Sequence, residues 1–235
     1  MRKTFTLFLL LSTVLGCKNS NQIVPQSSQF NTVKETAQSP LVVILGSSTA
    51  SGWGASDYKH AWAGLFSSYL NNGKVINLAK GGYTTYHILP SYADHQSSRP
   101  ESDTLRNITA ALKMHPTLLM ISMTTNDVNN GYNVDEVIAN LNAVRAMALA
   151  NGVRHFVITT SHPRKVNAAI TKKYIEQRDR VMAIFKDEAV NFFDPVADAD
   201  NFFRQELLST DGIHPNDQGH AILFDQIKTA FERNK

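Results

Sequence analysis

The chain has a single cysteine, Cys17, among its 235 residues. One cysteine cannot form an intramolecular disulfide framework, and it cannot supply a multi-cysteine zinc or iron–sulfur site. The chain also lacks a large excess of either charge, because 23 Lys and Arg residues and 20 Asp and Glu residues leave a net charge of only +3. This excess is too small and too scattered for a nucleic-acid-binding surface, so no nucleic-acid partner is expected.

The sequence also lacks a hydrophobic run long enough to cross a bilayer as a helix. It has no Gly-x-Gly-x-x-Gly or Walker A motif after any apolar run, which disfavours a nucleotide-binding protein. Its histidines show no convincing metal-ligand spacing, so no metal site is expected. With 43% hydrophobic and 18% charged residues, a chain that is disordered over its full length is excluded.

The first residues carry a targeting pattern. Arg2 and Lys3 precede a short apolar stretch at 5–15, and Gly16 stands directly before Cys17. This order resembles a bacterial lipoprotein signal, which implies that residues 1–16 are removed and that Cys17 is acylated. The alternative is an ordinary cleaved signal with an incidental cysteine.

The lipoprotein interpretation implies a place in the bacterial cell envelope, with the membrane contacted through the lipid anchor alone. Residues 17–39 are rich in Ser, Asn and Gln and are predicted to form a flexible tether. Residues 40–235 are then predicted to form a single folded domain.

Five apolar runs of the kind seen in buried parallel strands divide this domain, at 41–45, 74–78, 117–123, 155–160 and 189–193. Amphipathic segments at 134–150, 166–186 and 218–233 alternate with them. This alternation predicts an α/β fold with a mostly parallel, five-stranded sheet. In such sheets ligands bind beyond the carboxyl ends of the strands, so the segments after each strand hold the candidate site.

Polar segments follow the first three strands, at 46–50, 77–84 and 124–127, and a fourth, at 211–216, precedes the last helix. Each alone is typical of an ordinary turn or helix cap. Together they bring a hydroxyl, an imidazole, a carboxylate and several amide donors to one edge of the sheet, which is the set of groups that acyl transfer needs.

In this order the four segments resemble the sequence blocks of the SGNH (GDSL-type) hydrolase superfamily. The Gly-Asp-Ser-Leu block appears as residues 46–49, the Asn-x-x-x-x-Gly block as 77–82, the Gly-x-Asn-Asp block as 124–127 and the Asp-x-x-His block as 211–214. The resemblance implies a three-layer, flavodoxin-like α/β/α sandwich. It also implies a serine ester hydrolase.

Carried over residue by residue, the resemblance makes Ser48 the nucleophile, His214 the base and Asp211 the residue that orients the base. It makes the backbone N–H groups of Ser48 and Gly82 and the side-chain amide of Asn126 the oxyanion-hole donors. The chemistry of these residue types agrees, because a serine hydroxyl needs a base, and a tetrahedral oxyanion needs N–H donors. No metal or organic cofactor is required.

Three positions depart from the family pattern. Ser47 replaces the Asp of Gly-Asp-Ser, Thr49 replaces the Leu that follows the nucleophile, and Thr124 replaces the Gly of Gly-x-Asn-Asp. None of them supplies the nucleophile, the base or a named oxyanion donor. These three departures bear on the local loop geometry more than on the catalytic chemistry.

Other functions remain open at this point. The nearest rival is an α/β-hydrolase, but Ala50 replaces the second Gly of the Gly-x-Ser-x-Gly elbow, and Ser48 follows the first strand. A different class is a non-catalytic sugar-binding lipoprotein that kept the fold. Among substrates, we expect short-chain acyl esters, of small molecules or as O-acetyl groups on polysaccharide. Lysophospholipase and thioesterase activities are the alternatives.

Aromatic residues and one histidine lie near the expected site. Four aromatic residues are candidates either for the substrate pocket or for packing of the loops: Trp53, Tyr83, Tyr86 and Tyr132. Trp62 and Phe66 have helical spacing and are expected in the core. His162 follows the fourth strand and is expected to border the pocket, and the connection 83–103 is expected to shape it.

Overall fold

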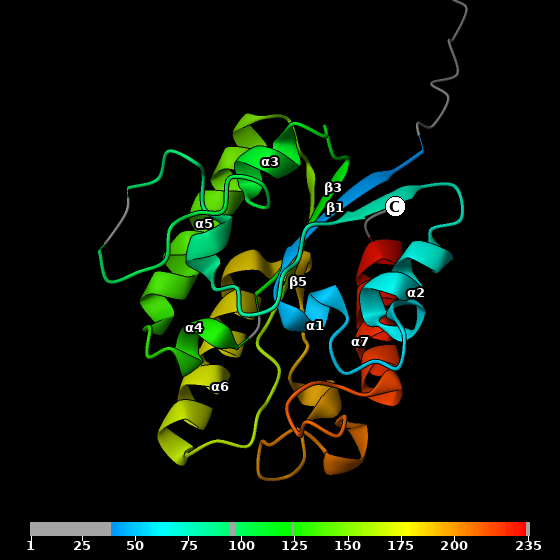
Figure 1. Ribbon diagram of the computed structural model, residues 1–235, viewed down its shortest axis with the longest axis vertical. Coiled ribbons are helices and arrows are strands. Elements are labelled where there is room, and N and C mark those ends of the chain that lie inside the picture. The colour runs from blue at the N-terminus through cyan, green and yellow to red at the C-terminus, as the bar shows by residue number, and fades with distance from the viewer. Residues whose placement is uncertain (1–38, 95–96, 124, 234–235) are drawn as a thin grey trace, which may run out of the picture. The chain divides into compact units, whose positions relative to one another are not determined.

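The structure is a computed structural model that describes residues 39–94, 97–123 and 125–233 (Figure 1). Five parallel strands lie at its centre in the order β2-β1-β3-β4-β5. Their bounds are β1 (Leu41–Gly46), β2 (Lys74–Asn77), β3 (Leu118–Ser122), β4 (His155–Thr159) and β5 (Ala189–Val190). The sequence predicted a mostly parallel sheet of five strands, and every pairing among the described strands is parallel.

The longer helices cover both faces of this sheet, and short helices fill the connections (Figure 1). The α-helices are α1 (Ser48–Ser51), α2 (Trp62–Tyr69), α3 (Ile108–Leu112), α4 (Asn126–Asn129), α5 (Val134–Ala150), α6 (Ala168–Phe185) and α7 (Asp217–Arg233). The 3-10 helices are η1 (Tyr58–His60), η2 (Thr85–Ile88), η3 (Lys186–Glu188), η4 (Asp194–Val196) and η5 (Gln205–Leu207). The three-layer α/β/α architecture implied by the family resemblance is confirmed.

Alternate residues of the central strands serve two separate cores. Val43 and Leu45 of β1 pack in the core on the side of α3, α5 and α6. Val42 and Ile44 pack in the core on the side of α2 and α7, where Trp62 and Phe66 are fully buried as predicted. The apolar runs in the sequence are continuous, rather than alternating, because helices cover both faces of the strands.

Local capping fixes the limits of several elements. Asn133 accepts a hydrogen bond from the Glu136 amide (2.8 Å), and Glu136 accepts one from the Asn133 amide (3.4 Å), so a capping box starts α5 at the predicted residue 134. The predicted fifth strand, 189–193, is too long. Asn191 accepts hydrogen bonds from the amides of Phe193 and Asp194, and this turn ends β5 at Val190.

None of the helices in the part of the chain that the structure describes is long and apolar enough to cross a membrane. The predicted signal peptide (1–16), Cys17 and all but the last residue of the tether (17–39) lie outside the described residues, as does Thr124. The predicted division of the chain at residues 16 and 39 therefore stays a prediction.

Candidate active site

Ser48 lies at a sharp strand-to-helix turn at the carboxyl end of β1. Gly46 is the last residue of the strand, and a Cβ there would lie 2.5 Å from the Cβ of Ala50, so the turn accepts only glycine. The Ser47 amide donates to the Ser122 carbonyl at the end of β3 (3.2 Å). Ser48 is then the first residue of α1, held between the two central strands.

His214 and Asp211 lie beside this turn, on the loop before α7. Nε2 of His214 is 2.8 Å from Oγ of Ser48, and Nδ1 of His214 is 2.7 Å from Oδ2 of Asp211. When Nδ1 carries the ring proton and donates it to the Asp211 carboxylate, Nε2 carries the lone pair and accepts a hydrogen bond from the Ser48 hydroxyl. The three side chains, 166 residues apart at their extremes, thus form one chain of hydrogen bonds.

Asp211 is itself fixed in place. Its Oδ1 accepts hydrogen bonds from the amides of Ile213 (2.8 Å) and His214 (2.9 Å) and from the hydroxyl of Ser209 (2.8 Å). Partial burial acts to raise the pKa of Asp211, but these bonds and the one from the His214 ring hold that pKa well below its usual range. The carboxylate therefore stays ionised beside the imidazole.

The loop after β2 lies on another side of Ser48. The Asn77 side chain donates to the Ala50 carbonyl at the end of α1 (2.7 Å) and accepts from the Ala79 amide (3.0 Å), while the Lys80 amide donates to the Gly46 carbonyl (3.1 Å). These bonds join the loop to the Ser48 turn. Gly82 follows with φ +83°, a conformation that glycine adopts without strain.

Asn126 begins α4 after β3 and reaches the same loop. Its Nδ2 donates to the carbonyl of Tyr83 at 2.8 Å. A primary amide has two N–H groups, so one bond positions the side chain against the residue next to Gly82, and the nitrogen carries a second donor. The structure thus brings to one edge of the sheet every segment that the sequence analysis placed there.

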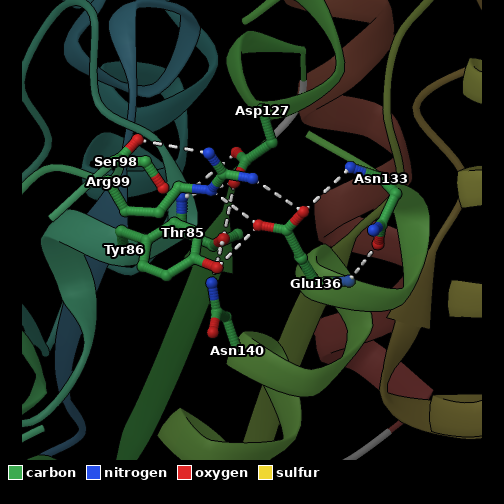
Figure 2. Close-up of polar contacts among 8 residues, drawn as sticks. All are labelled: Thr85, Tyr86, Ser98, Arg99, Asp127, Asn133, Glu136 and Asn140. Carbon is green, nitrogen blue, oxygen red and sulfur yellow. Dashed lines mark hydrogen bonds and ion pairs between the residues drawn. The ribbon is translucent and has the colours of Figure 1, made fainter. Parts of the chain in front are cut away.

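Asp127 has a role that the sequence analysis did not assign, although it is the last residue of its block. Both of its carboxylate oxygens accept from the Thr85 amide (3.0 and 3.1 Å), and Oδ1 also accepts from the Thr85 hydroxyl (2.5 Å), as Figure 2 shows. Burial raises the pKa of Asp127 to about 6, against the effect of these bonds. Asp127 therefore ties the Asn126 helix to the segment that follows Gly82.

The connection 83–103 is fastened to α5 by a second group of contacts (Figure 2). Arg99 forms a two-pronged ion pair with Glu136 (2.7 and 2.9 Å), and the Tyr86 hydroxyl donates to the same carboxylate (2.7 Å). The pKa of Glu136 falls to about 2, chiefly because of Arg99. The Arg99 guanidinium also lies 4.1 Å from the centre of the Tyr132 ring.

These contacts decide the roles of the four aromatic candidates. Tyr83, Tyr86 and Tyr132 are buried in the core on the α5 side, so they pack the loops. Trp53 is 55% exposed, and its ring lies 5.3 Å from the His214 ring at an interplanar angle of 64°. Trp53 is thus the one aromatic residue of the four that borders the catalytic group of side chains on its open side.

His162 lies behind the nucleophile turn. Its Nδ1 donates to the Pro163 carbonyl (3.0 Å), so Nε2 accepts from the hydroxyl of Thr49 (3.1 Å). Burial lowers the pKa of His162 to about 3. Thr49, which departs from the Leu of the family pattern, has a polar partner in the interior, and His162 touches the turn from within.

Among the described residues, no cluster of three or more His, Cys, Asp or Glu side chains could hold a metal ion. The arrangement brings a hydroxyl, a base and amide donors around one point. These are the groups that acyl transfer uses.

Comparisons with known proteins agree with this architecture. Residues 44–222 match the GDSL-like Lipase/Acylhydrolase family. A GDSL lipase of Mycobacterium tuberculosis is 44% identical over 50 residues, which is 21% of this chain and 22% of that protein. The chain therefore matches only about a fifth of the length of this curated relative.

Solved structures share the fold at low sequence identity. A GDSL-like lipase from Bacteroides thetaiotaomicron has a TM-score of 0.63 and 21% identity over 84% of this chain and 90% of that one. A carbohydrate esterase family 3 protein from Talaromyces cellulolyticus has a TM-score of 0.55 and 18% identity over 83% and 97%. The family match spans most of the described residues, so the chain belongs to the GDSL-like Lipase/Acylhydrolase family, whose fold these solved structures share.

Proposed function

We propose that this chain hydrolyses short-chain acyl esters through Ser48, His214 and Asp211, and that O-acetyl groups on carbohydrate are its substrate class. The observation that carries the mechanism is the continuous pair of hydrogen bonds from Ser48 to His214 (2.8 Å) and from His214 to Asp211 (2.7 Å). These are the contacts that activate a serine hydroxyl at neutral pH.

In the first half of the reaction, Oγ of Ser48 attacks the ester carbonyl while Nε2 of His214 takes its proton. Asp211 stabilises the imidazolium that forms. His214 then gives the proton to the leaving alcohol oxygen, and the acyl group remains on Ser48. In the second half, a water molecule takes the place of the alcohol, and the same residues release the acid and restore the serine.

Both tetrahedral intermediates carry a negative oxygen. The proposed donors to it are the backbone N–H groups of Ser48 and Gly82 and the second N–H of the Asn126 amide. The bond from Asn126 to the Tyr83 carbonyl and the fixed turn at Gly82 support this assignment, because donors that are already in place need no reorganisation during the reaction.

The proposed mechanism is tested on 4-nitrophenyl acetate. Ser48→Ala and His214→Ala are expected to remove nearly all activity, whereas Asp211→Asn retains more, because Asp211 does not touch the substrate. Ser67→Ala, which changes an exposed serine of α2, is the matched control and is expected to keep full activity. Full activity in Ser48→Ala or His214→Ala would contradict the mechanism.

The substrate class is tested with a panel of esters and thioesters of increasing acyl length, together with acetylated polysaccharide and lysophospholipid. Preference for acetyl esters supports the proposal. Preference for lysophospholipids or for thioesters would favour those activities of the same fold. Saturable sugar binding without turnover of any ester would favour the non-catalytic binder.

We also propose that the protein is anchored in the bacterial cell envelope through an acylated Cys17. The order Arg2-Lys3, apolar stretch, Gly16-Cys17 is the support for this proposal. Cys17→Ser, expressed in a bacterial host, is expected to block acylation and the cleavage that follows it. Processing of this variant with unchanged electrophoretic mobility would favour an ordinary cleaved signal.

A further inference from the structure

An exposed tryptophan is fixed beside the proposed base. The Trp53 amide donates to the Ser48 carbonyl (3.0 Å), and the Trp53 carbonyl accepts from Nε2 of buried His220 (3.0 Å). Its ring lies against Gly81, where a Cβ would come within 2.6 Å of the indole. The indole is therefore held between the loop of the oxyanion donors and the loop of the base, although 55% of the residue faces solvent.

Trp53 lies where the alcohol half of the substrate is expected. His214 must reach the leaving oxygen of the ester within about 3 Å to protonate it. The indole is in edge contact with that same imidazole, with ring centres 5.3 Å apart. The first atoms of the alcohol half, which follow directly after the leaving oxygen, therefore come next to Trp53.

A groove opens beside this point. It begins at Gly54, the residue after Trp53, has a volume of about 470 Å³, and is lined in part by Ser56, Ser209, Thr210, Asp217 and Gln218. The volume is within the range of small-molecule sites. Both oxygens of Asp217 accept from Ser56 (2.7 and 2.6 Å), so this wall of the groove is pre-arranged.

The lining chemistry separates the substrate classes. Hydroxyl, amide and carboxylate groups line the groove beside apolar carbon, and no Lys or Arg is among the described lining residues, so the groove offers no cation to a phosphate headgroup. A sugar ring combines an apolar face of C–H groups, which packs on an indole, with hydroxyls that exchange hydrogen bonds with such a lining.

We propose that Trp53 is a stacking platform for the alcohol half of the substrate, and that this alcohol is a saccharide whose further units lie along the groove from Gly54 to Gln218. The proposal rests on the proposed function, since it assigns a side of the reacting ester. It makes Trp53 the residue that selects cyclic, sugar-like alcohols over linear ones. Because the indole is already fixed, stacking costs little conformational entropy.

The first test measures binding without turnover, in the Ser48→Ala protein titrated with acetylated xylotriose. The chain has two tryptophans, and Trp62 is fully buried, so a change in emission that the ligand causes is expected to come from Trp53. By calorimetry, adding Trp53→Ala is expected to weaken binding at least tenfold. Tyr92→Ala, which removes an aromatic residue that is 76% exposed outside the site, is the matched control and leaves binding unchanged.

The second test compares turnover of acetylated xylotriose and of butyl acetate. Trp53→Ala is expected to lower the ratio of kcat/KM for acetylated xylotriose to kcat/KM for butyl acetate at least tenfold, mainly by raising KM of the sugar ester. Trp53→Phe is expected to keep most of this preference. Gln218→Ala is expected to raise KM severalfold for the trisaccharide and to leave KM of an acetylated monosaccharide unchanged, because only the longer ligand extends along the groove.

The outcomes separate the two proposals. If Trp53→Ala lowers kcat/KM equally on both esters and leaves sugar binding intact, Trp53 only supports His214, and the stacking proposal is overturned. If wild-type protein cleaves butyl acetate, and Ser48→Ala does not, the proposed hydrolase function stands whatever Trp53 does. Turnover that survives in Ser48→Ala would instead remove the proposed function, while the ratio of kcat/KM values for the two esters in Trp53→Ala still reports on Trp53.

Discussion

The hydroxyl of Thr49 lies 3.1 Å from Nε2 of His162, in a fully buried position directly behind the Ser48 turn. Thr49→Val keeps the shape but removes the donor, so the ring nitrogen loses its partner. We expect the free energy of unfolding to fall by about 1–3 kcal/mol. We also expect kcat to fall by less than about 100-fold, because α1 and Ser48 shift slightly.

Urea unfolding and the kinetics of 4-nitrophenyl acetate hydrolysis check this prediction. Thr49→Ser keeps the hydroxyl and is the matched control, with most of the stability and activity retained. A Thr49→Val protein as stable and as active as the parent would mean that the contact with His162 contributes nothing to the turn.

Two buried histidines make the protein sensitive to acid. Burial lowers the pKa of His162 to about 3 and that of His220 to about 4, whereas a histidine in an unfolded chain titrates near about 6.5. Between these values the unfolded chain binds protons that the folded chain does not. The free energy of unfolding therefore falls as the pH drops below about 6.5, by about 2 kcal/mol per histidine at pH 5.

Urea unfolding at pH 7 and pH 5 tests this prediction. The readout is the change in the free energy of unfolding between the two pH values, compared between parent and variant. Asp127, with a pKa raised to about 6, acts in the opposite direction and cancels in that difference. His162→Gln and His220→Gln are each expected to weaken the pH dependence, and His155→Gln, at an exposed position, is expected to leave it unchanged. Equal pH dependence in all four proteins would contradict the assignment.

Asn126→Ala tests the amide as an oxyanion donor. Because the oxyanion exists only after attack, kcat is expected to fall by about 100- to 1,000-fold with little change in KM. Asn129→Ala on the same short helix is the matched control, since it loses a 2.6 Å bond with the Tyr174 hydroxyl but no contact with the site. A loss confined to KM in Asn126→Ala would make Asn126 a substrate-binding residue only.

Gly54 and Gly152 form a matched pair that tests whether the close packing of Gly54 against the loop of His214 is needed for activity. Both have left-handed backbones, with φ +91° and +90°. A Cβ at Gly54 would meet the Pro215 carbonyl oxygen at 2.3 Å and Cβ of His214 at 2.7 Å, whereas one at Gly152 would meet nothing within 4 Å. Alanine at either position is expected to cost about 1–2 kcal/mol in backbone strain.

Only Gly54→Ala is then expected to lower kcat strongly, because the added methyl group pushes His214 away from Ser48. Steady-state kinetics beside urea unfolding separate the two effects. If both variants lose stability equally and neither loses activity, the close packing of Gly54 on the base loop does not position His214.

The sequence by itself determined the sheet and most of the site. Continuous apolar runs at five places are characteristic of strands covered on both faces, and residues of β1 and β3 pack in both cores. The amphipathic segment at 134–150 predicted α5 with its observed bounds, and the capping box of Asn133 and Glu136 that starts this helix is a contact between neighbours in the chain. The four polar blocks could be placed at one edge because parallel strands end together.

Only the tertiary structure decided which side chains meet. In the sequence, Trp53 and Tyr83 were equal candidates for the substrate pocket. In the structure Tyr83 is buried in the core, whereas Trp53 is 55% exposed and its ring packs against Gly81 and His214. The partnership of Thr49 with His162 spans 113 positions, so no local pattern could indicate it. Capping, periodicity and turn chemistry act over a few residues, whereas burial and hydrogen bonding across the sheet depend on where the whole chain brings distant segments together.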